Sequence, residues 1–167
     1  MNGWIGLGSS WYEKELSSLA ERIAGDGPDR QLLETLAGEL QVSSSVRFLG
    51  RKTEEELPLL YRNSRALVLP SRREGLPITL LEAGASGTIC IGTQTPGIPE
   101  IIDEGVTGYL VPPESSEELA NAILKTLRLS PVETANFRQA ARNRIASQFS
   151  EAGMIDQYVG LYKTVLG

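Results

Sequence analysis

The sequence contains no histidine, a single cysteine and only 6% aromatic residues. Histidine is the commonest general base and the commonest nitrogen ligand of metal ions. Acid–base chemistry in this chain must therefore use carboxylates, lysine or tyrosine, or be supplied from elsewhere. The lone Cys90 excludes an internal disulfide framework and fits a reducing compartment.

Long hydrophobic runs are also missing. No apolar run approaches the roughly 20 residues of a membrane-spanning helix, and the opening is not signal-like, so we expect a cytoplasmic location. The net charge of −5 argues against a nucleic-acid partner, because neutralisation of phosphates by basic residues is the main source of that affinity. A chain of 167 residues with ordinary apolar and charged fractions is most simply one globular domain.

Short apolar segments alternate with helical patterns of ten or more residues along most of the chain. This alternation predicts an α/β fold, a Rossmann-like three-layer parallel sheet with helices on both faces. We expect strands at residues 4–8, 19–24, 46–50, 66–69, 88–91 and 109–111. We expect helices at residues 11–20, 29–40, 53–61, 77–86, 98–103, 115–127, 131–149 and 150–166.

The segment EGLPITLLE places Glu74 and Glu82 with seven residues between them, at a strand-to-helix corner. Pro77 is tolerated in the first turn of a helix, where its missing N–H has no intrahelical partner. Free amides and the positive end of the helix dipole at Gly75, Leu76 and Ile78 then make an anion site beside a carboxylate. A phosphate on the helix end and hydroxyls on the carboxylates would suit a sugar nucleotide. Alternatively, Glu74 only stabilises the helix start and Glu82 lies on a solvated face.

Glycine-rich corners follow several of the predicted strands, at residues 25–28, 50, 74–77 and 93–99. In parallel sheets, ligands bind outside the carboxyl ends of the strands. These corners are therefore expected to face one crevice. The alternative for any single corner is an ordinary turn.

Taken together, five motifs resemble a known family. The motifs are IAGDGPDRQLLE, VRFLG, LVLPSRREGLPITLLEAGASG, PGIPEII and GVTGYLVPPE, which begin at Ile23, Val46, Leu67, Pro96 and Gly105. Their order and spacing resemble the C-terminal, donor-binding half of the group-one glycosyltransferases, the retaining family numbered four, which has the two-lobed GT-B fold. The resemblance implies a nucleotide-sugar-binding domain at residues 25–149, preceded by a shortened opening, 1–24, and followed by a crossover helix, 150–167.

The resemblance also implies roles for particular residues. Glu74 would contact hydroxyls of the donor sugar and is the catalytic candidate, and Glu82 would hold the ribose hydroxyls. The donor would be a nucleotide sugar such as a UDP- or GDP-sugar, with no metal and no further cofactor. Transfer would retain the anomeric configuration. The remaining candidates are backbone amides for sugar and phosphate oxygens, at Gly75, Leu76, Ile78 and Thr79, and two residues beside the base, Arg51 and Lys52.

Two departures from the family pattern qualify these expectations. The family grips the diphosphate with an Arg and a Lys in the first strand and helix of this lobe, whereas here Leu7 stands at the Arg position. Lys14 is the candidate for the Lys. Arg72 and Arg73 could compensate, although we favour a solvated loop for them.

The second departure is that no N-terminal, acceptor-binding lobe accompanies this one. We therefore expect the isolated chain to hold a donor without transferring sugar. The helix at 150–166, which crosses onto that lobe in the family, would self-associate or dock on an N-terminal partner. Membrane attachment, where it occurs, would come through that lobe.

Three interpretations follow, and we favour the first. They are the donor-binding part of a glycosyltransferase, a non-catalytic binding or regulatory module, and a truncated inactive fragment. A flavodoxin-like domain is a weaker fourth.

Overall fold

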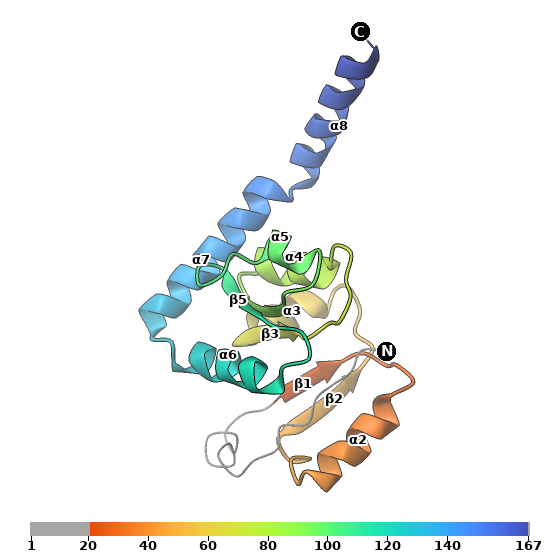
Figure 1. The fold of residues 1–167 in the computed structure, drawn as a ribbon, viewed down its shortest axis with the longest axis vertical. Coiled ribbons are helices and arrows are strands. Elements are labelled where there is room, and N and C mark those ends of the chain that lie inside the picture. The colour runs from red at the N-terminus through yellow and green to blue at the C-terminus, as the bar shows by residue number, and fades with distance from the viewer. Residues whose placement is uncertain (1–20, 167) are drawn as a thin grey trace. The chain divides into compact units, whose positions relative to one another are not determined.

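The computed structural model describes residues 21–166 (Figure 1). These residues group into two compact units, 21–57 and 58–166, which are described separately below. The strand expected at 4–8, the helix expected at 11–20 and the candidate Lys14 lie outside the described residues. The division into an opening, a binding domain and a final helix remains a prediction.

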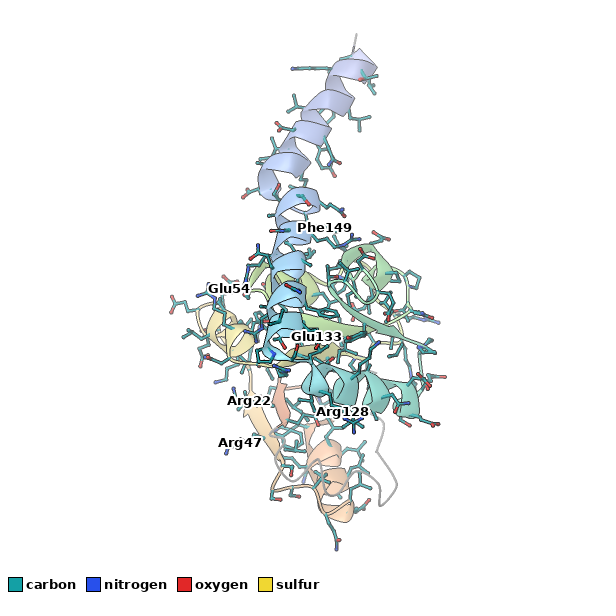
Figure 2. The ribbon with its side chains drawn as sticks, turned by 90° about the vertical axis from the view of Figure 1, so that its left-hand side faces the viewer. Arg22, Arg47, Glu54, Arg128, Glu133 and Phe149 are labelled. Atoms are coloured by element: carbon teal, nitrogen blue, oxygen red, sulfur yellow. The ribbon has the colours of Figure 1, made fainter. Side chains whose placement is uncertain are left out.

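The first unit contains two parallel strands, β1 (Glu21–Ala24) and β2 (Val46–Gly50), with helix α2 (Arg30–Glu39) between them in the chain. Arg22 of β1 lies opposite Arg47 of β2 in the register, and both are labelled in Figure 2. A capping box forms after β2, since Thr53 and Glu56 exchange hydrogen bonds of 2.9 and 3.3 Å. However, residues 54–56 form only a turn, and helix α3 (Leu57–Arg62) begins after this turn.

The second unit is built on three parallel strands in the order β3 (Ala66–Leu69), β4 (Ile89–Thr93) and β5 (Gly108–Val111). All five residues of the central strand β4 are buried. A strand buried on both faces reads as a continuous apolar run rather than an alternating one, which is why 88–91 could be assigned from the sequence. The parallel strands and intervening helices confirm the predicted α/β class.

Helices cover both faces of this sheet (Figure 1). On one face, Ile91, Tyr109 and Val111 pack with Ala122 of α6 (Ser116–Arg128). On the other face, Gly92 lies against Ile98 of α5 (Ile98–Ile101). The same face carries Cys90, whose thiol points at the carbonyl of Leu80 in α4 (Ile78–Ala85). Burial raises the pKa of this thiol to about 12.

Helix α7 (Pro131–Gln148) ties the ends of the other helices together through arginines. It begins in a capping box between Ser130 and Glu133, and Figure 2 labels Glu133 near its start and Phe149 just beyond its end. C-terminal carbonyls of a helix have no intrahelical partner, and cations near them are favourable. Guanidinium groups of α7 donate to backbone carbonyls at or beyond the ends of α3, α4 and α5: Arg138 to Ser64, Arg142 to Ser86, and Arg144 to Ile101.

The last helix, α8 (Glu151–Leu166), has no buried residue. Its large apolar side chains are all between 44% and 81% exposed: Met154, Ile155, Tyr158, Val159, Leu161, Tyr162, Val165 and Leu166. None of the helices in residues 21–166 has the length and apolarity to cross a membrane.

Candidate functional site

Glu74 lies in the loop that joins β3 to α4, and its carboxylate is held by a neighbouring hydroxyl. The Oγ of Ser71, a residue that is only 2% exposed, donates to Oε1 of Glu74 over 2.5 Å. Glu74 itself is half-buried. A hydrogen bond to a carboxylate is stronger than one between neutral groups, so Ser71 fixes the direction in which Glu74 presents its other oxygen.

The loop after β4 supports this arrangement from the neighbouring strand. The hydroxyl of Thr93 donates to the backbone carbonyl of Ser71, and the Thr93 and Thr95 hydroxyl oxygens lie 3.4 Å apart. All three residues are buried. Buried hydroxyls are costly unless they are hydrogen-bonded, so the chain of bonds from Thr95 to Glu74 constrains both loops.

A contact between two glycines brings these loops together. Gly97, just before α5, has φ +88°, a left-handed conformation that glycine adopts at no steric cost. A Cβ at this position would overlap the carbonyl of Gly75, the residue that follows Glu74. The backbone at the start of the Glu74 segment is therefore packed directly against the loop after β4.

The start of α4 is open to a ligand. Gly75, Leu76, Ile78 and Thr79 are exposed, while Pro77 and Leu80 between and beyond them are buried and anchor the segment. Because the first amides of a helix have no intrahelical acceptor, this end of α4 offers hydrogen-bond donors and the positive end of the helix dipole. These residues are thus accessible to a ligand, and the anion site itself stays a prediction.

Glu82 is an exposed residue of α4 and contacts a tyrosine that the sequence analysis did not select. The hydroxyl of Tyr61, in α3, donates to Oε2 of Glu82 over 3.0 Å. The sequence analysis placed Tyr61 only at the end of the helix expected at residues 53–61. A buried tyrosine hydroxyl needs a hydrogen-bond partner, which could have drawn attention to Tyr61. The sequence did not indicate which residue that partner is.

The structure also describes four other sequence candidates. Arg51 and Lys52 belong to the first unit, where Nζ of Lys52 pairs with Glu56 over 2.9 Å, and their role beside a base stays a prediction. Arg72 pairs with Glu114 over 2.9 Å on the surface, and Arg73 is exposed. Nowhere in residues 21–166 do three or more Asp, Glu or Cys side chains gather closely enough to bind a metal ion.

Glu74, the exposed start of α4 and Glu82 thus lie along one segment of the second unit, and comparisons with known proteins identify the family of the chain. The family model described as "Glycosyl transferases group 1" matches residues 12–144. The chain belongs to this family of glycosyltransferases.

Individual relatives support the assignment. N-acetyl-alpha-D-glucosaminyl L-malate synthase of Bacillus anthracis is 33% identical over 144 residues, which cover 86% of this chain and 37% of that protein. The solved sucrose-phosphate synthase of Thermosynechococcus elongatus is 28% identical and has a TM-score of 0.78. The matched region covers 87% of this chain and 38% of the synthase chain. This chain thus spans less than half the length of these relatives.

A third likeness concerns the fold alone. Anabaena Alr3699/HepE, solved in complex with UDP-glucose, has a TM-score of 0.79 at 21% identity. The matched region covers 93% of this chain and 46% of the HepE chain. The fold shared with these GT-B glycosyltransferases confirms the Rossmann-like class predicted from the sequence.

The contact between Gly97 and Gly75 yields a prediction. We expect Gly97→Ala to lower the free energy of unfolding by about 1–3 kcal/mol, because the methyl group meets a backbone carbonyl that cannot rotate away. Denaturant titration followed by circular dichroism measures this. Gly27→Ala is the matched control, since a Cβ at Gly27 meets no atom within 4 Å. Equal stability of the two variants would contradict the close contact.

Proposed function

We propose that this chain is the donor-binding part of a retaining glycosyltransferase and that residues 74–82 hold a nucleotide sugar. One observation carries the proposal. Two glutamates flank the exposed start of α4, and each carboxylate is oriented by a hydroxyl from outside the helix, that of Ser71 or Tyr61. Carboxylates oriented in this way accept hydrogen bonds from hydroxyl groups, and a helix N-terminus binds phosphate.

Each part of the ligand has a proposed place. Glu74 accepts from hydroxyls of the donor sugar, Glu82 accepts from the ribose hydroxyls, and the first amides of α4 bind the phosphate and sugar oxygens. Arg51 and Lys52 are proposed to lie by the base and Lys14 by the diphosphate. The binding of UDP and of UDP-glucose by Alr3699/HepE, which has the same fold, supports a nucleotide-sugar ligand.

The proposed chemistry is electrostatic and uses no metal. The bond between the anomeric carbon and the diphosphate breaks, and an acceptor hydroxyl oxygen forms a new bond to that carbon on the same face, so the configuration is retained. Negative charge develops on the leaving diphosphate, which takes up the proton that the acceptor hydroxyl loses. Backbone N–H groups at the start of α4 would donate hydrogen bonds to this charge and so stabilise the transition state. Selection of an acceptor is assigned to a separate lobe, so the isolated chain is proposed to bind donor without transferring it.

A non-catalytic binding or regulatory module is the second candidate. The observation that favours it is Leu7, which occupies the position where the family pattern has an arginine for the diphosphate. Such a module would retain nucleotide binding through Glu82 while lacking part of the charge needed for transfer.

Calorimetric titration with UDP, GDP, ADP and their sugar derivatives tests the donor site. We expect saturable binding of one nucleotide and its sugar, and a loss of about 10- to 100-fold on Glu82→Ala, because hydrogen bonds to a charged group contribute about 1.5–3 kcal/mol. Glu117→Ala, on the exposed first turn of α6, is the control and should bind normally. No binding at millimolar ligand would contradict the donor role.

The exposed face of α8 leads to a second part of the proposal. Soluble proteins rarely leave a contiguous apolar stripe of this length uncovered. We propose that another protein surface covers it, either a second copy of the chain or an N-terminal lobe. Among the 16 residues of α8, only Glu151, Asp156 and Lys163 are charged, so little opposes burial of the apolar face.

Sedimentation velocity over a range of concentrations tests this surface. We expect the chain to self-associate or to be recruited by an added N-terminal lobe, and Tyr162→Glu to abolish either association, because a charge would be buried. Gln157→Glu, on the opposite side of α8, is the control. A strictly monomeric chain whose α8 amides are protected from hydrogen exchange would show instead that α8 packs on its own domain.

A further inference from the structure

The tyrosine beside Glu82 comes from a different element and is itself firmly held. Tyr61 is only 5% exposed, at the end of α3. Its backbone carbonyl accepts from the hydroxyl of Thr88 over 2.8 Å and from the amide of Ser64 over 3.0 Å. Thr88 is fully buried and directly precedes β4. The position of the phenol is therefore set by the central strand rather than by α3 alone.

Glu82, in contrast, is an exposed side chain with three rotatable bonds. Free in solvent, it would sample many rotamers, and a ligand that used both its oxygens would have to order it on binding. The hydrogen bond from Tyr61 engages Oε2 and leaves Oε1 and further lone pairs available. The carboxylate is thus partly ordered before a ligand arrives.

The protonation state of the phenol suits this role. Burial, followed by the hydrogen bond and charge of Glu82, raises the pKa of the Tyr61 phenol far above its usual range. The phenol therefore keeps its proton and stays a donor at neutral pH. Within residues 21–166, Glu82 is absent from the ion pairs formed.

We propose that Tyr61 is a positioning residue for ribose recognition: its hydroxyl orients Glu82 so that the carboxylate accepts from the ribose hydroxyls of the nucleotide. This inference rests on the proposed function. It adds a residue of α3 to a site otherwise formed by the loop after β3 and by α4. A tyrosine retained only for packing would contribute its ring and not its hydroxyl.

Removing that hydroxyl separates the two roles. The experiment compares the wild-type chain with Tyr61→Phe, which keeps the ring. The ligands are UDP, GDP or ADP, whichever binds, and its 2′,3′-dideoxy counterpart, which lacks the ribose hydroxyls. We expect Tyr61→Phe to weaken the ribonucleotide by about 3- to 10-fold and to leave the dideoxy nucleotide unchanged. In the Glu82→Ala background the same substitution should have no further effect.

Each alternative outcome overturns a definite claim. Equal weakening of both nucleotides, or no weakening of either, overturns the positioning role, and thermal unfolding of Tyr61→Phe identifies a loss of folding as the cause. If the wild-type chain binds none of the nucleotides, the proposed function fails and this inference with it. If it binds a nucleotide but does not discriminate against the dideoxy form, Glu82 does not read the ribose and the inference also fails.

Discussion

The close packing of Gly97 against the carbonyl of Gly75 is the contact on which the rest of the site depends. It fixes the loop after β4 on the loop after β3. The hydrogen bond from the Thr93 hydroxyl to the Ser71 carbonyl also connects these two loops. Ser71 in turn holds Glu74. Because protein interiors are close-packed and buried hydroxyls must be paired, a shift of either loop would disturb all of these contacts together.

In the part of the chain that the structure describes, both glutamates of the site are oriented by neutral hydroxyls rather than by arginine or lysine. Within residues 21–166, the ion pairs formed involve neither Glu74 nor Glu82. A carboxylate whose charge is not already neutralised forms charge-assisted hydrogen bonds with incoming hydroxyl groups. This electrostatic arrangement suits a ligand rich in hydroxyls, with its phosphates placed at the positive end of α4.

Much of the fold could be predicted from the sequence, because burial on a sheet or on one helix face leaves a periodic pattern. The strand at 46–50 and the long helix from Pro131 were assigned with nearly correct bounds. The starts of helices were predicted less accurately. Thr53 forms a capping box with Glu56, yet α3 begins at Leu57 and not at residue 53. The helix expected at 98–103 ends at Ile101, since Ile102 has an extended conformation.

The site was predicted only in part for a related reason. Glu74, Glu82 and the exposed residues between them lie in one segment, so local spacing together with the family resemblance was sufficient to select them as candidates. Tyr61 is 21 residues away from Glu82 in the chain, and Gly97 lies 22 residues from Gly75. Such pairings depend on how strands are ordered in the sheet, which local patterns do not encode.

The most direct test of a donor site at the start of α4 is an amide NMR titration of the isotope-labelled chain with the nucleotide that binds. The account predicts saturable shifts concentrated at Gly75, Leu76, Ile78 and Thr79 and extending to Glu82 and Tyr61. Shifts concentrated elsewhere, with these amides unmoved at saturation, would contradict it.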